Sequence, residues 1–216
     1  MIQVITFHSY KGGVGKTTLA VNLAALLAKS GKNVCILDTD FNAPSLHDYF
    51  SEHNSKKRNT VNDYLIGSCK VEDLFVDISS ISKLLDKGSL SGKITVCFSG
   101  SKREDILKIE GAMWENSRSK MLKRFIELKE QIGKTDIDYI IIDSASATKF
   151  WAINAIAISD IIFITQKMQE VDIGGYNMIS DKVLDRFKEQ EISRNRLVLN
   201  MVPGYCVPNL QDKTCT

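Results

Sequence analysis

A glycine-rich segment near the start of the chain lies between a strand-like run and a helix-like stretch. Residues 10–18 read YKGGVGKTT, and the apolar run at 2–7 before them is typical of a buried strand. Leucines then recur at helical spacing, at Leu19, Leu23, Leu26 and Leu27. A strand, a tight loop and a helix in this order predict the first unit of a parallel α/β sheet.

The loop has the residue types that hold a polyphosphate. Gly12, Gly13 and Gly15, with Val14 between them, let the backbone turn tightly and bring its N–H groups against an anion. A Cβ atom at the glycines would intrude on that approach. We therefore predict that these four residues bind the phosphates of a nucleotide.

Three side chains after the glycines complete the predicted phosphate site. Lys16 supplies a positive charge, and the helix expected to begin there directs its unpaired N–H groups at the same anion. Thr17 stands where the hydroxyl of a P-loop binds the Mg²⁺ of the nucleotide, and Thr18 is expected to reach the α-phosphate. The cofactors predicted from this segment are ATP or ADP and Mg²⁺.

The loop departs from the general pattern G-x-x-x-x-G-K-[ST], because Tyr10 takes the place of the first glycine. Its KGG before the final lysine resembles the deviant Walker A motif of the ParA/MinD superfamily of P-loop ATPases. In that superfamily the early lysine, here Lys11, crosses a dimer interface to the partner's phosphates. The resemblance implies an ATP-dependent homodimer in which Lys11 and Lys16 take part in catalysis.

The rest of the chain predicts one α/β domain over residues 1–216, with a doubly wound, mostly parallel sheet and helices on both faces. Strand-like runs recur at 33–38, 94–98, 139–143, 160–165 and 197–202. Apolar stripes at helical spacing lie between them, at Met121, Leu122, Phe125, Leu128 and Ile132 and at Tyr176, Ile179, Val183 and Phe187. The hydrophobic content of 44% over 216 residues suffices for a full core.

Two aspartates follow the second predicted strand, at the sheet edge where doubly wound folds bind ligands. Asp38 and Asp40 lie in LDTD, which resembles the D-x-D switch I motif of the superfamily. That resemblance places Asp40 near Mg²⁺ and the attacking water, as a catalytic residue, and Asp38 near the waters of Mg²⁺. The alternative is that each acid caps a turn, as isolated aspartates do.

Two later strands resemble other parts of the superfamily's site. Residues 136–144 resemble its Walker B strand, whose final acid, here Asp143, contacts Mg²⁺ through water. The superfamily usually continues with Pro or Gly, whereas this chain has SASAT at 144–148, the switch II segment. Residues 197–203 resemble the strand whose Asn reads adenine, here Asn200. No N-K-x-D motif follows, which favours ATP over GTP.

Charge and cysteine content bear on partners and compartment. The net charge of +2, with basic clusters interleaved with acids, does not indicate strong nonspecific DNA binding by a monomer, although a dimer could join the clusters. Five cysteines without a C-x-x-C pair suit a reducing compartment, and no apolar run is long enough for a membrane helix. The expectation is a cytoplasmic protein with no membrane-targeting helix at 206–216 and no iron–sulfur cluster.

The resemblance implies a switch that partitions or positions DNA or a cellular assembly through an unidentified protein or DNA partner. Three alternatives stay open. Residues 40–45 also resemble the switch segment of the Mrp-like iron–sulfur carriers, although the C-x-x-C of that branch is absent. A metabolic P-loop enzyme and a non-hydrolysing nucleotide sensor are the others. His8 is expected to be structural, and truncation at the C-terminus is a further possibility, since superfamily members commonly carry more helices.

Overall fold

The structure is a computed structural model, and it describes residues 2–50, 58–79, 91–100, 104, 106–107, 109, 111, 118–168 and 194–202. Several predictions lie outside these ranges. They are the apolar stripe at 176–187, the C-terminal segment 206–216 with its two cysteines, and the basic clusters at 56–57 and 102–103.

A seven-stranded sheet forms the centre of the domain, in the order β3-β4-β2-β5-β1-β6-β7. Its strands are β1 (Gln3–His8), β2 (Val34–Thr39), β3 (Val76–Asp77), β4 (Ile94–Cys97), β5 (Tyr139–Ser144), β6 (Ile161–Gln166) and β7 (Arg194–Leu199). Every pairing is parallel except that of β3 with β4 at one edge. The predicted sheet is thus confirmed.

One predicted strand was misplaced along the sequence. The pattern indicated 197–202, whereas β7 runs over Arg194–Leu199 and pairs with β6 from Ile161↔Arg194 to Gln166↔Leu199. β7 is the last strand in the sheet, and an edge strand tolerates the charged side chains with which it begins. Those polar residues concealed the start of the strand from a search for apolar runs. The other predicted strands agree with the structure to within one residue at either end.

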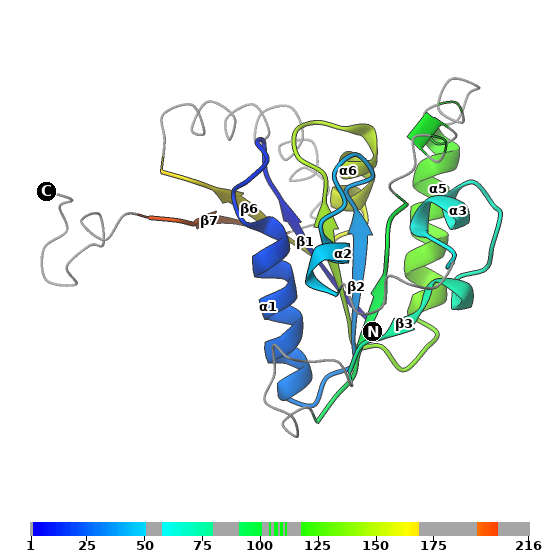
Figure 1. Cartoon of the computed structure of the whole chain (residues 1–216), viewed down its shortest axis with the longest axis horizontal. Coiled ribbons are helices and arrows are strands. Elements are labelled where there is room, and N and C mark those ends of the chain that lie inside the picture. The colour runs from blue at the N-terminus through cyan, green and yellow to red at the C-terminus, as the bar shows by residue number, and fades with distance from the viewer. Residues whose placement is uncertain are drawn as a thin grey trace, which may run out of the picture.

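Helices cover both faces of the sheet (Figure 1). α1 (Lys16–Lys29) packs on one face, where Ala20, Val21 and Ala24 lie among side chains of β1, β2 and β5. α5 (Arg118–Ile132) and α6 (Phe150–Ala157) cover the other face, and short helical segments complete the described part. These are α2 (Leu46–Tyr49), α3 (Val61–Leu65) and η2 (Glu72–Leu74). None of the helices in the described ranges is long and apolar enough to cross a membrane.

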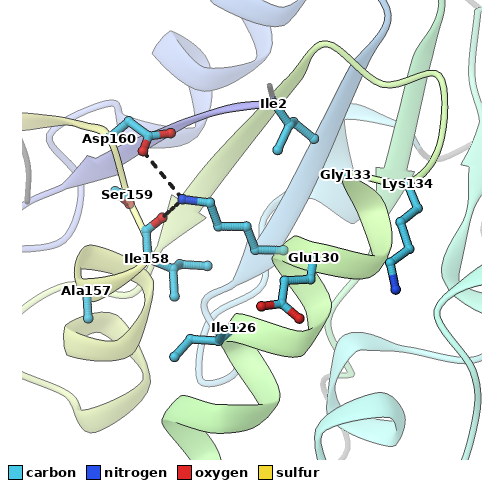
Figure 2. Close-up of a pocket in the computed structure, with 10 residues that line it drawn as sticks. Ile2, Ile126, Glu130, Gly133, Lys134, Ala157, Ile158, Ser159 and Asp160 are labelled. Carbon is cyan, nitrogen blue, oxygen red and sulfur yellow. Dashed lines mark hydrogen bonds and ion pairs between the residues drawn. The ribbon is translucent and has the colours of Figure 1, made fainter.

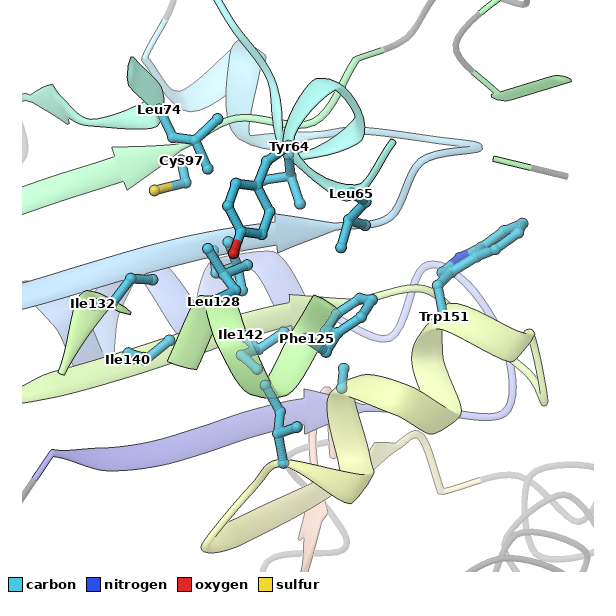
Figure 3. Close-up of a cluster of buried hydrophobic side chains, with 14 of the residues drawn as sticks. Tyr64, Leu65, Leu74, Cys97, Phe125, Leu128, Ile132, Ile140, Ile142 and Trp151 are labelled. Carbon is cyan, nitrogen blue, oxygen red and sulfur yellow. The ribbon is translucent and has the colours of Figure 1, made fainter. Parts of the chain in front are cut away.

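The stripe predicted for α5 is the side of that helix that faces the core (Figure 3). Phe125, Leu128 and Ile132 are fully buried, and Met121 is nearly so. They pack against side chains of β5 such as Ile140 and Ile142. Because the sheet is covered on both faces, its central strands are apolar almost throughout, as the sequence indicated.

The parallel arrangement brings the carboxyl ends of four strands to one edge of the sheet. β1 leads into the glycine-rich loop, β2 into Asp40, β5 into the switch II segment, and β7 into Asn200. Segments far apart in the chain therefore meet around the N-terminus of α1.

Candidate functional site

The P-loop, residues 10–16, is held by the end of β7. Gly15 precedes α1 with φ of 90°, a left-handed conformation that disfavours a side chain. The side-chain amide of Asn200 donates from Nδ2 to the carbonyl of Val14 at 2.8 Å. A Cβ atom added at Gly15 would lie 2.4 Å from that Nδ2. Both the backbone and the approach of Asn200 therefore require glycine at position 15.

Lys16 is buried at the start of α1 and faces the switch II segment. Its side chain is 7% exposed, and Nζ donates to Oγ of Ser146 at 2.8 Å. Burial lowers the pKa of Lys16, and the charges of Asp143 and Asp40 oppose that shift. The lysine therefore sits among acidic groups and has a neutral hydroxyl as its hydrogen-bond acceptor.

Thr17 connects the P-loop to β5. Its Oγ1 donates to Oδ2 of Asp143 at 2.6 Å and lies 2.6 Å from Oγ of Ser45. Thr18, the next residue, is exposed and makes a hydrogen bond with the hydroxyl of Tyr49 in α2. The structure thus brings together the two groups predicted to bind Mg²⁺ from α1 and β5.

Asp38 and Asp143 lie opposite each other at the ends of β2 and β5, and both are buried. Burial raises the pKa of Asp143 to about 6, and the hydrogen bond from Thr17 and the charge of Lys16 oppose this. Burial, and then the charge of Asp143, hold the pKa of Asp38 well above its usual range. Two facing carboxyl groups of this kind disfavour ionisation unless a cation is nearby.

The residues at this point fit a hydrated Mg²⁺. Oδ2 of Asp38 and Oδ1 of Asp143 are buried and have no hydrogen-bond partner in the described part of the structure. Mg²⁺ prefers oxygen ligands and keeps several of its waters, which donate hydrogen bonds to carboxylates. Thr17, Asp38 and Asp143 supply only oxygen atoms. A cation with its waters would satisfy both orphaned atoms and reverse the cause of the raised pKa values.

Asp40 lies two residues beyond Asp38, in the loop after β2, and is half-buried. Its backbone N–H donates to Oδ1 of Asp38 at 3.0 Å, and its own Oδ1 accepts from the N–H of Ala43 at 3.2 Å. Burial raises the pKa of Asp40, against the hydrogen bond from Ala43 and the charge of Lys16. The aspartate does cap a turn, as the alternative reading held, while its carboxylate stays within electrostatic reach of the P-loop lysine.

The switch II segment rests against the P-loop and the residue before it. The N–H of Ala147 donates to the carbonyl of Ser9 at 2.9 Å, and the hydroxyls of Ser9 and Ser146 are 3.4 Å apart. Ser9 also donates from Oγ to the carbonyl of Lys11 at 2.5 Å. A chain of hydroxyl groups therefore connects Lys16, on one side of the loop, with the backbone of Lys11 on the other.

Unusual backbone conformations mark the two segments that contact the P-loop. Within the described ranges, the non-glycine residues with positive φ are Ala147, at 63°, and Met201, at 55°. Each adjoins a residue bonded to the P-loop, Ser146 in one case and Asn200 in the other. Left-handed conformations of this kind cost roughly 1–2 kcal/mol per residue, and such strain gathers at functional sites.

His8 is structural, as expected. It is buried at the end of β1, and its Nδ1 lies 2.9 Å from Oγ of Ser144 at the end of β5. Burial, and then the charge of Lys16, lower the pKa of His8 to about 3, so the ring is neutral at physiological pH. The pair ties together the strands that lead into the P-loop and the switch II segment.

A hollow of about 560 Å³ lies at the opposite edge of the sheet, near the start of β1 and β6 (Figure 2). Its wall includes Ile2, Ile126 and Ile158. Two of the charged groups in it are paired with each other, because Lys129 donates from Nζ to the carbonyl of Ile158 at 2.9 Å and lies 3.4 Å from Asp160. None of the predicted site residues lines this hollow, so the candidate site lies around the P-loop, at the carboxyl ends of the strands.

Comparison with known proteins agrees with this geometry. A family model described as an AAA domain matches residues 2–197. The septum site-determining protein MinD of Bacillus subtilis is 27% identical over 97% of this chain and 68% of its own length. The sporulation initiation inhibitor protein Soj of the same organism is 28% identical over 85% of this chain and 65% of its own length. The chain belongs to this family, in the ParA/MinD superfamily of P-loop ATPases.

Solved structures of the superfamily show the same fold. MinD of Pyrococcus horikoshii OT3, which was solved in complex with Mg-ADP, has a TM-score of 0.68 and 20% identity over 92% of this chain and 70% of that one. The chain spans about two thirds of the length of the curated MinD and Soj relatives. The resemblance predicted from the doubled-lysine loop is therefore confirmed, and the activity of the chain remains to be argued from its own residues.

The structure brings most of the predicted residues of the ParA/MinD site into one place. Thr17 is hydrogen-bonded to Asp143, and Asp38 is the neighbour of Asp143 on the next strand and is hydrogen-bonded to the backbone of Asp40. Lys16 interacts with Asp143 and Asp40 through charge. Asn200 is at the same edge, on the carbonyl of Val14. Sequence reasoning missed the hydroxyls of Ser146, Ser9 and Ser45. The available signal was the departure of the switch II segment from Pro and Gly, because that departure introduces Ser146.

Proposed function

We propose that this ParA/MinD-type ATPase binds Mg²⁺-ATP at the P-loop edge, hydrolyses it, and uses the cycle as a dimerisation switch. The observation that carries the proposal is the hydrogen bond of 2.6 Å from Thr17 to Asp143. Beside it lie two buried carboxylate oxygens that have no hydrogen-bond partner among the described residues. This is the arrangement that a hydrated Mg²⁺ requires. Bound Mg²⁺ neutralises charge on the phosphates of the nucleotide.

The chain's own residues have separate parts in nucleotide binding. Gly12 to Gly15 offer backbone N–H groups, and Thr18 offers a hydroxyl for the α-phosphate. Lys16 exchanges its hydrogen bond with Ser146 for the phosphates, while Thr17 holds the cation together with Asp143 and Asp38. Asn200 keeps the loop in shape through Val14 and reads the base with its remaining amide oxygen.

Hydrolysis of this kind requires positioning and charge neutralisation rather than a covalent nucleophile. Asp40, half-buried and close enough to Lys16 for mutual electrostatic influence, is the residue that would orient the attacking water. Lys11 of a second copy would stabilise the charge that develops on the phosphates, as an arginine finger does. Turnover would then depend on dimerisation.

The output proposed for the cycle is spatial: the ATP-bound dimer holds a protein or DNA partner in the cytoplasm, and hydrolysis releases it. The roles of the relatives, septum site determination by MinD and inhibition of sporulation initiation by Soj, support an organising role over a metabolic one. The paired lysines at 11 and 16 support it as well, because they resemble the loop in which the early lysine crosses a dimer interface.

Calorimetric titration of the purified chain with ATP and ADP, in Mg²⁺ and in EDTA, tests the nucleotide site. The wild type should bind both nucleotides, and Mg²⁺ should strengthen ATP binding by about tenfold or more. Thr17→Ala should abolish the effect of Mg²⁺, whereas Thr17→Ser, which keeps the hydroxyl, should retain it. A nucleotide affinity that changes neither with Mg²⁺ nor in the Lys16→Ala variant would contradict the proposal.

Phosphate release separates a switch from a passive sensor. Wild-type protein should release phosphate from ATP faster than Lys16→Ala does, and Asp40→Ala should bring the rate down to that baseline while it leaves ATP binding intact. Equal rates for all three proteins would favour the non-hydrolysing nucleotide sensor.

A further inference from the structure

The hydroxyl of Ser146 is a hydrogen-bond partner of Lys16. It accepts from Nζ at 2.8 Å, and Lys16 is almost completely buried at that point. A P-loop lysine binds the β- and γ-phosphates. The oxygen of Ser146 therefore lies one hydrogen bond away from a group that must itself contact the terminal phosphate.

Ser146 is also close to the backbone of the P-loop. A Cβ atom added at Gly12 would lie 3.8 Å from Oγ of Ser146, and no other heavy atom of the described residues outside its chain neighbours would lie within 4 Å of it. Oγ of Ser9 is 3.4 Å from Oγ of Ser146. Ser146 thus faces the early part of the cradle, beside Lys11 and Gly12, as well as Lys16.

A serine hydroxyl can accept one hydrogen bond and donate another at the same time. Ser146 accepts from Lys16, and it can turn its proton toward Ser9. When Lys16 binds phosphate, the same hydroxyl can donate to a phosphate oxygen that lies against the lysine. The same hydroxyl can therefore serve with and without nucleotide, because only the acceptor of its hydrogen bond changes.

The backbone next to Ser146 is held in place at a cost. Ala147 has φ of 63°, and its N–H donates to the carbonyl of Ser9 at 2.9 Å. An alanine in this region is strained, and the strain persists only when surrounding contacts impose it. The hydrogen bond from Ala147 to Ser9 fixes the peptide group that joins Ser146 to Ala147. It thereby holds Ser146 next to the strand that leads into the P-loop.

From these contacts we infer that Ser146 is the specificity-determining residue that distinguishes ATP from ADP. Its hydroxyl donates a hydrogen bond to the γ-phosphate. The inference rests on the nucleotide site proposed above and adds to it a side chain of the switch II segment. ADP has no γ-phosphate, so in its complex the hydroxyl of Ser146 stays on Ser9. The contact links the presence of the third phosphate to the position of the switch II segment.

Equilibrium binding tests this assignment without relying on turnover. A fluorescent ADP and a non-hydrolysable ATP analogue are titrated, with Mg²⁺, into the wild type, Ser146→Ala, Ser146→Thr and Ser30→Ala. Ser30 is exposed at the distant end of α1 and serves as the matched control. Ser146→Ala should weaken binding of the analogue by about tenfold, since it loses a hydrogen bond to a charged group, and change ADP binding by less than about twofold. Ser146→Thr should restore most of the difference.

The outcomes separate the inference from the proposed function. If the wild type and Ser30→Ala bind both nucleotides, and Ser146→Ala binds both as they do, the inference is overturned while the nucleotide site stands. An equal loss of ADP and analogue in a folded Ser146→Ala, as checked by thermal melting without nucleotide, overturns it too, because the serine then only positions Lys16. A wild type that binds neither nucleotide overturns the proposed function itself.

Discussion

Asp38 and Asp143 face each other across neighbouring parallel strands, both buried at the carboxyl edge of the sheet. Burial raises the pKa of each, and the charge of Asp143 adds to the shift of Asp38. In the nucleotide-free protein this pair resists ionisation, and the resistance has a consequence for stability.

Stability of the nucleotide-free protein should depend on pH through Asp143. Its pKa is about 6 in the folded state and 3.8 in the reference state, so the folded protein binds more protons between these values. By linkage, the contribution is fully present below pH 3.8 and is lost as pH rises through 6, by about 3 kcal/mol at most. Asp143→Asn should therefore gain stability relative to the wild type as pH rises from 4 to 7.

The measurement is denaturant unfolding of both proteins at several pH values, because the difference between them cancels the titration of groups that do not interact with Asp143. Asparagine keeps an oxygen that can accept from Thr17, so the variant tests charge rather than the hydrogen bond. If the difference in unfolding free energy between the two proteins stays constant from pH 4 to 7, the pKa of Asp143 is not raised in the folded protein.

Two glycines of the P-loop should respond differently to alanine. Gly13 and Gly15 both have positive φ, at 72° and 90°. Among the residues that the structure describes, a Cβ atom at Gly13 meets nothing within 4 Å, whereas one at Gly15 would lie 2.4 Å from Nδ2 of Asn200. Gly13→Ala should cost about 1 kcal/mol of unfolding free energy from backbone strain alone. Gly15→Ala should cost more, because it also displaces Asn200 from Val14. Equal losses in unfolding experiments would argue that the Asn200 contact is unimportant.

Asn200 should contribute to the choice of base. Its Nδ2 is used on Val14, which leaves the amide oxygen as an acceptor that suits the amino group of adenine and repels the O6 of guanine. Asn200→Ala should narrow the preference for ATP over GTP by about tenfold or more in competition binding. A uniform weakening of both nucleotides, with the preference unchanged, would mean that Asn200 only supports the loop.

The sequence predicted the parts of the site that are carried by local motifs. The P-loop, the start of α1 at Lys16 and the acid at the end of β5 each follow from residues adjacent in the chain. The contact of Ser146 with Ser9 spans 137 positions and arises from the parallel register of β1 with β5. Hydrophobic periodicity cannot predict such a contact, because it does not determine which strands are neighbours in the sheet.

The shift of β7 has a different origin. Apolar periodicity identifies strands that are covered on both faces, and it placed β2, β4 and β5 to within a residue. β7 begins with Arg194, Asn195 and Arg196 at the edge of the sheet, where pairing with β6 alone defines the strand. The prediction placed Asn200 inside the strand, whereas the structure places it just after β7, the position from which it reaches Val14.

The central claim, an ATP-dependent dimer that requires Lys11, is tested most directly by light scattering on the Asp40→Ala protein, in which hydrolysis should be slow. With Mg²⁺-ADP the mass should be that of one chain, 24.2 kDa, and with Mg²⁺-ATP it should be twice that value. Adding Lys11→Ala should return the ATP-bound mass to that of one chain, whereas Lys32→Ala, an exposed lysine beyond the far end of α1, should leave the dimer intact. A single-chain mass in ATP, or a dimer that survives the loss of Lys11, would contradict the account.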